Sequence, residues 1–143
     1  MTDTQERLSM VLYDGHFDKV HYALAMASSA AVLDKPVTLF FTMNACKGLM
    51  KDWRDMPVSR GQQNGSEENG GQMDDRFADQ KIATYEELLS ACVELGVTFM
   101  VCEMGLAARE LSASDLRDDV PVTPGGLVTF LSESGKHGNI IFI

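Results

Sequence analysis

The chain has 143 residues, of which 45% are hydrophobic, and a formal net charge of −9 at pH 7. This length supplies one buried core but is short for two, so we expect a single domain over residues 1–143. The acidic balance and the lack of a phosphate-neutralising Lys/Arg cluster argue against nucleic acid and against anionic membranes as partners. The polar, acidic amino-terminus lacks the features of a secretory signal, and no apolar run approaches the roughly 20 residues of a spanning helix. We therefore expect a cytoplasmic protein with no membrane segment.

The first part of the chain predicts a strand, a helix and a second strand. Residues Leu8–Tyr13 form the first apolar strand pattern, and Asp14–His16 predict a turn at its carboxyl end. A helix follows from about Asp18 to Leu33, with apolar residues at helical spacing. The nearly continuous apolar run Pro36–Thr42 is typical of a strand that is covered on both faces.

Two segments of different character follow the second strand. Residues Asn44–Lys51 predict the start of a helix, which places Cys46 at the carboxyl edge of the sheet. From about residue 60 to 80 the chain is rich in Gly, Gln, Asn and acidic residues, with almost nothing apolar to bury. Such a segment cannot offset the entropy cost of ordering, so we predict a flexible polar insert.

A helix and a third strand come after this insert. Thr84 and Glu87 form a capping box at the start of a helix that runs to Gly96. Cys92 lies on the apolar stripe of this helix, and we interpret it as a core residue. Residues Thr98–Cys102 predict the third strand.

The last part of the chain predicts short elements and a closing strand. Glu103–Glu110 and Ser112–Asp115 indicate short helices, and Val120–Gly126 indicates a turn region. An apolar helix over Leu127–Ser134 and a buried strand over Asn139–Ile143 follow. The alternation of strands and helices without hairpin turns predicts a three-layer α/β/α domain with a mainly parallel sheet of about five strands.

Cys102 is the leading candidate for chemistry. It stands where the third strand gives way to a helix, and open parallel α/β sheets place their ligand-binding crevices at such carboxyl ends. This position predicts partial exposure, and amides of Met104 and Gly105 can stabilise a thiolate, whereas the Glu103 carboxylate opposes it by charge repulsion. A cysteine in an apolar strand is also commonly a packing residue, so position alone leaves both interpretations open.

Other candidate groups are predicted at the same carboxyl edge of the sheet. Cys46 is a possible second thiol, either as a resolving cysteine or as an ordinary residue of a helix start. Asp14, Gly15 and His16 follow the first strand, where His16 can bind a substrate or shift the ionisation of a nearby thiol.

The sequence gives no signal for a metal or a cofactor. The three cysteines and three histidines have no ligand spacing, so a metal site is poorly supported. No glycine-rich dinucleotide or Walker-type phosphate loop is present, and no GxSxG elbow indicates a hydrolase.

The chain resembles the DsrE/DsrF-like proteins, in particular the branch labelled DsrE-like or peroxiredoxin family. The resemblance covers most of the chain outside residues 54–80. It is carried by Gly15-His-Phe-Asp-Lys19, Val37-Thr-Leu-Phe-Phe-Thr42, Tyr85-Glu-Glu-Leu-Leu89, Leu95-Gly-Val97, Cys102-Glu-Met-Gly105 and the closing apolar strand.

This resemblance implies a cytoplasmic homo-oligomer, a trimer or a hexamer, that accepts sulfane sulfur on a cysteine as a persulfide. It implies Cys102 as the acceptor and a TusA-like or rhodanese-like sulfur carrier as the partner. Two alternatives stay open. One is a thiol redox protein in which Cys102 and Cys46 cycle through a disulfide, and the other is a non-enzymatic oligomeric binding module.

Overall fold

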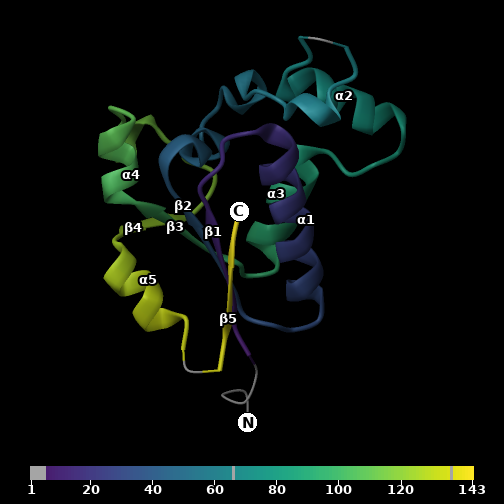
Figure 1. Ribbon diagram of the computed structural model, residues 1–143. Coiled ribbons are helices and arrows are strands. Elements are labelled where there is room, and N and C mark those ends of the chain that lie inside the picture. Colours follow the sequence, from purple (N-terminus) through teal and green to yellow (C-terminus); the bar gives the residue numbers. More distant parts are fainter. Residues whose placement is uncertain (1–5, 66, 136) are drawn as a thin grey trace.

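The computed structural model describes residues 6–65, 67–135 and 137–143. Its centre is a five-stranded sheet in the order β4-β3-β2-β1-β5, with every neighbouring pair parallel (Figure 1). The strands are β1 (Leu8–Leu12), β2 (Val37–Phe41), β3 (Thr98–Cys102), β4 (Val122–Gly125) and β5 (Asn139–Phe142). The predicted α/β fold with a parallel sheet of about five strands is therefore confirmed.

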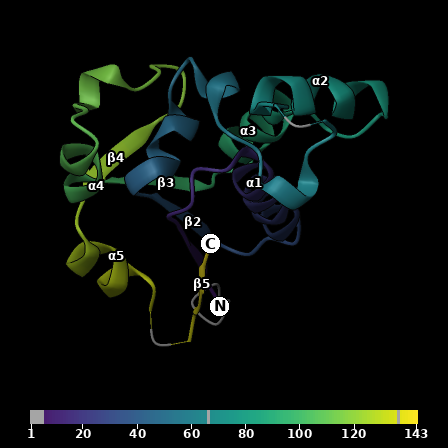
Figure 2. The same cartoon turned by 45° about the horizontal axis from the view of Figure 1, so that its top comes forward.

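Helices cover both faces of this sheet. The α-helices are α1 (Phe17–Val32), α2 (Gly70–Asp79), α3 (Tyr85–Glu94), α4 (Glu103–Ala108) and α5 (Leu127–Glu133). The 3₁₀ helices are η2 (Met43–Leu49), η3 (Trp53–Asp55), η4 (Arg60–Gln62) and η5 (Ala113–Asp115). Helices α1 and α3 lie together on one side of the sheet and α5 lies on the other (Figures 1 and 2). Among the described residues, no helix is both long enough and apolar enough to cross a membrane.

The buried side chains form two clusters because successive residues of a strand point to opposite faces. All five residues of β2 are buried, as expected of a strand with a neighbour on each side and helices above and below. The larger cluster lies under α1 and α3 and includes Leu12, Phe41 and Val101. The smaller cluster lies under α5 and consists of Val11, Phe40, Met100, Cys102 and Phe130.

The polar insert predicted at about residues 60–80, with almost nothing apolar to bury, contains a helix that was not predicted from the sequence, since Gly70–Asp79 form α2. Asn69 and Gln72 make a reciprocal capping box at its start. Met73 is buried against the larger cluster, and the buried Asp74 carboxylate accepts a hydrogen bond from the Tyr85 amide at 2.7 Å. A few long-range contacts therefore hold a helix that composition alone does not indicate.

The predicted turn region Val120–Gly126 is also different in the structure, since Val122–Gly125 form β4. This strand pairs with β3, and Gly125 lies opposite Cys102 in the register. It lies at the edge of the sheet, where the missing amide of Pro124 is tolerated. The predicted helix start after the second strand is present as η2, a 3₁₀ helix.

Candidate functional site

The parallel sheet brings the candidate residues to one edge. Asp14–His16 follow β1, Cys46 lies in η2 after β2, and Cys102 is the last residue of β3. Because β1, β2 and β3 are adjacent and parallel, the segments that follow them start side by side. Helix α4 then runs from the end of β3 and packs against η2.

Cys102 is more buried than the sequence predicts. It is the N-cap residue of α4, yet only 2% of its surface is exposed. Its neighbours include Phe40 and Phe130, whose rings stack with centroids 4.7 Å apart. The expectation of partial exposure is wrong because Cys102 belongs to a buried cluster, to which α5, distant in the sequence, contributes Phe130.

The three residues after Cys102 have different environments. Glu103 and Met104 are exposed, whereas Gly105 is buried. A methyl group on Gly105 would clash with the Thr42 hydroxyl and would lie 2.6 Å from the Met43 amide nitrogen. Only glycine therefore allows the first turn of α4 to pack this closely on η2.

The other two cysteines are fully buried. Burial, with a smaller effect from a Cys102 charge, raises the pKa of the Cys46 thiol to about 11. Burial likewise raises the pKa of Cys92 to about 12, and its thiol donates a hydrogen bond to the Leu24 carbonyl at 3.5 Å. The interpretation of Cys92 as a core residue is confirmed, and both thiols are protonated at neutral pH.

Asp14 organises the loop after β1. Its carboxylate accepts hydrogen bonds from the His16 amide at 2.9 Å, from the His16 ring Nδ1 and from Lys19 Nζ at 2.9 Å. Partial burial by itself raises the pKa of Asp14, but the hydrogen bonds from Lys19 and His16 outweigh it and lower the value from 3.8 to about 2. Since an ionised carboxylate can only accept, it holds the proton of His16 on Nδ1.

Gly15 brings this loop against η2. A Cβ atom at Gly15 would lie 2.6 Å from the Asn44 Cβ and 2.7 Å from the Asn44 carbonyl oxygen. The loop after β1 and the start of η2 therefore form one continuous wall.

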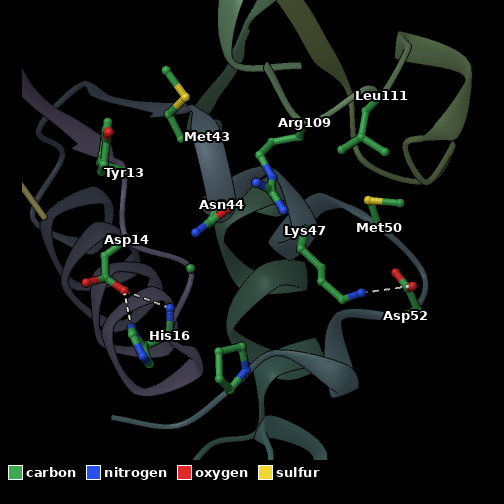
Figure 3. Close-up of a pocket in the computed structure, with 12 residues that line it drawn as sticks. Tyr13, Asp14, His16, Met43, Asn44, Lys47, Met50, Asp52, Arg109 and Leu111 are labelled. Carbon is green, nitrogen blue, oxygen red and sulfur yellow. Dashed lines mark hydrogen bonds and ion pairs between the residues drawn. The ribbon is translucent and has the colours of Figure 1, made fainter. Parts of the chain in front are cut away.

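This wall borders a cavity of about 610 Å³ (Figure 3). Asp14, Gly15 and His16 line it, as do residues from η2, from the segment after η2 and from the end of α4. The others are Tyr13, Met43, Asn44, Lys47, Met50, Asp52, Pro57, Arg109 and Leu111. Neither Cys102 nor Cys46 is among the lining residues. The candidate residues at this edge of the sheet therefore lie in two places. Cys102 is buried, whereas Asp14, Gly15 and His16 line an open cavity.

Sequence reasoning missed Arg109 and the polar residues of η2. Arg109 is the C-cap residue of α4, seven positions after Cys102, and no motif surrounds it. Asn44 and Lys47 flank Cys46, which attracted attention instead. In the part of the chain that the structure describes, no three His, Cys, Asp or Glu side chains are grouped as metal ligands.

Comparison with known proteins identifies the family. The model of the DsrE/DsrF-like family matches residues 18–137. The chain belongs to the DsrE/DsrF-like family. It is 26% identical, over the full length of both chains, to the uncharacterized protein YrkE of Bacillus subtilis (strain 168). The crystal structure of the ychN protein from E. coli has a similar fold, with a TM-score of 0.53 and 18% identity over 98% of this chain and 100% of that one.

In this DsrE/DsrF-like chain, the Asp14 hydrogen bonds predict a pH-dependent contribution to stability. The folded pKa of about 2 lies below the ordinary 3.8, so ionised Asp14 stabilises the fold above about pH 4 and loses this effect as the pH falls toward about 2. Asp14→Asn should therefore lower the free energy of unfolding near pH 6 and have little effect near pH 2. Urea unfolding across this range, with the exposed Asp79→Asn as control, measures it. A difference between Asp14→Asn and the natural protein that does not change with pH would contradict the account.

The packing of Phe130 predicts that α5 controls access to Cys102. Phe130→Ala removes the buried ring that α5 contributes to the cluster of Cys102, so alkylation of Cys102 by iodoacetamide should accelerate by about ten-fold or more. Peptide mass spectrometry measures the rate at each cysteine. Val128→Ala, on the same helix at an 84% exposed position, should leave the rate unchanged.

Cys92 serves as an internal control in that experiment. It lies in the larger cluster, away from α5, and reacts only if the whole domain opens. An equal acceleration at Cys92 and Cys102 would mean global unfolding. An unchanged rate at Cys102 would show that α5 is not the barrier.

Proposed function

We propose that this protein carries sulfane sulfur, accepting it on Cys102 as a persulfide and passing it to a partner sulfur carrier. Membership of the DsrE/DsrF-like family supports a role of the sulfur-relay type. The observation that carries the proposal is that Cys102 ends β3 and is the N-cap residue of α4. The first amides of a helix lack intrahelical partners, and such amides favour a thiolate over a thiol, although the Cys102 side chain makes no cap hydrogen bond in the structure.

The proposed chemistry is two exchanges without net oxidation. The Cys102 thiolate attacks the outer sulfur of a donor persulfide, so a new S–S bond forms on Cys102 and the donor leaves as a thiolate. A thiolate of the recipient then attacks the outer sulfur of the Cys102 persulfide. That step returns Cys102 to the thiolate and leaves the persulfide on the recipient.

The environments of Cys46 and Cys92 argue against either of them as the acceptor. Burial raises the pKa values of Cys46 and Cys92 to about 11 and 12, so neither is an effective nucleophile at neutral pH. The same burial gives no support to the alternative in which Cys46 and Cys102 cycle through a disulfide. All three cysteines are free thiols.

Access to Cys102 requires α5 to move. This helix has seven residues, and Phe130 is its one buried side chain. Leu127, Val128 and Leu131 are exposed on it. A partner that binds these apolar side chains can displace α5 and reach the thiol, and short elements with few buried contacts open at low free-energy cost. We propose a TusA-like or rhodanese-like carrier as that partner.

We propose further that the protein is a homo-oligomer that associates through the β5 edge. Ile140 and Phe142 are 50% and 68% exposed, and the Phe142 ring lies 5.5 Å from the ring of Tyr13. Among the described residues β5 pairs only with β1, so its outer backbone groups are open to a further strand. An edge strand with exposed aromatic residues is suited to a second copy of the chain.

Loading with sulfur tests the proposed function. After incubation with a sulfane-sulfur donor, the protein should gain about 32 Da for each sulfur atom added to a thiolate. Cys102→Ser should abolish the gain, whereas Cys46→Ser and Cys92→Ser should keep it. Intact-protein mass spectrometry measures all four proteins.

Two results would contradict the assignment. A gain that persists in Cys102→Ser would place the sulfur on another residue. A loss of about 2 Da that both Cys102→Ser and Cys46→Ser prevent would indicate a disulfide between them and favour the redox alternative.

The β5 edge predicts the effect of a charge on self-association. Phe142→Asp should reduce the mass measured by sedimentation equilibrium from a multiple of 15.7 kDa toward that of one chain. Leu33→Asp places the same charge at a 69% exposed apolar position at the end of α1 and should leave the mass unchanged. A natural protein with the mass of one chain would refute the proposal.

A further inference from the structure

The cavity at the end of α4 has the composition of a small-molecule site. It lies between the loop after β1, η2 and the end of α4, and its volume of about 610 Å³ is within the range of ligand pockets. Much of its wall is apolar or soft, with Met43, Met50 and Leu111 among the lining residues. Such walls accept the hydrocarbon part of a ligand, and thioether side chains adapt to its shape.

The polar groups of the cavity leave one positive charge without a partner. Asp14 is hydrogen-bonded to Lys19, and Asp52 pairs with Lys47 at 3.1 Å. Over residues 6–65, 67–135 and 137–143, no carboxylate lies within ion-pair distance of Arg109. Figure 3 shows the Arg109 side chain directed toward Asn44 and Lys47. The cavity therefore offers a guanidinium and an amide to an incoming anion.

The backbone at the cavity also has an unusual conformation at Met43. Met43 has a φ of 51°, in the left-handed region that residues with a side chain seldom adopt. Close packing fixes this conformation, since Gly105 of α4 lies directly against the Met43 amide. Strained residues that packing holds in place are concentrated at binding and catalytic sites.

We propose that this cavity binds a small organic carboxylate. Arg109 receives the carboxylate, because its planar fork matches two carboxylate oxygens, and Asn44 supplies a further amide donor. The apolar part of the ligand lies against Met43, Met50 and Leu111. Arg109 is the cation of the lining that pairs with no carboxylate of the described residues, and one guanidinium suits a monoanion better than a phosphate dianion, which the nearby side chains of Asp14 and Asp52 disfavour.

The proposal does not depend on sulfur transfer. Cys102 does not line the cavity, and it stands at the opposite end of α4 from Arg109. The two are the caps of this six-residue helix, and their seven-position separation corresponds to about 10 Å along the axis. Loss of binding in the cavity and loss of persulfide formation can therefore be measured separately.

A matched pair of probes tests the site. The natural protein is titrated with 2-naphthoate, an apolar monoanion, and with 2-naphthamide, its neutral counterpart, and nuclear magnetic resonance spectra follow the backbone amides. Naphthoate should bind more tightly than naphthamide and should shift the amides of Asn44, Lys47 and Met50. Arg109→Gln should weaken naphthoate binding by about ten-fold or more, the usual size of a lost charge-assisted hydrogen bond.

Arg60→Gln is the control, because Arg60 is an exposed arginine of η4 outside the cavity. It should leave the affinity unchanged, whereas Arg109→Lys should keep part of it through the retained charge. Absence of naphthoate binding, equal affinity for the two probes, or equal weakening by Arg109→Gln and Arg60→Gln would overturn the proposal. Tighter binding of inorganic phosphate than of naphthoate at the same residues would overturn the carboxylate assignment.

Discussion

The parallel pairing of β1, β2 and β3 determines where every candidate functional group lies. Because the three strands run in one direction, the segments that follow them leave the sheet at the same edge. The complete burial of β2 fixes this arrangement, since sliding it by one residue would exchange its two buried faces. The loop of Asp14, the 3₁₀ helix η2 and the thiol of Cys102 are neighbours as a consequence.

Helix α4 links two chemically different environments at that edge. At its start, Cys102 lies in an apolar cluster together with Phe130. At its end, Arg109 lines an open cavity of mixed polarity. Gly105 allows the helix to pack closely against η2, so α4 connects the buried thiol to the wall of the cavity. Helix α5 contributes one buried side chain, and in our proposal its movement changes access to the thiol.

The sequence predicts the parts of this structure that local patterns determine. The apolar run of β2 and the capping box of Thr84 and Glu87 are both present where the sequence indicates them. Patterns of this kind depend only on residues close in the sequence. The same holds for Cys92, whose place on an apolar helical stripe predicts its burial.

The remaining features depend on contacts between distant residues. Helix α2 is polar, and one contact that holds it in place is the hydrogen bond that the Tyr85 amide donates to the Asp74 carboxylate. Cys102 is buried in a cluster that includes Phe130, 28 positions later, and no local pattern contains that information. Arg109 becomes a candidate ligand-binding residue only because the end of α4 packs beside η2. Long-range packing therefore decides both the exposure of the thiol and the composition of the cavity.

The most direct test of the sulfur-carrier account is transfer between purified proteins. Protein loaded with sulfur on Cys102 is freed of donor and mixed with a TusA-like carrier, and the masses of both chains are followed over time. The account predicts that this chain loses about 32 Da while the carrier gains it, with no disulfide left between the two proteins. Sulfur that stays on Cys102, or that leaves without appearing on the carrier, would contradict it.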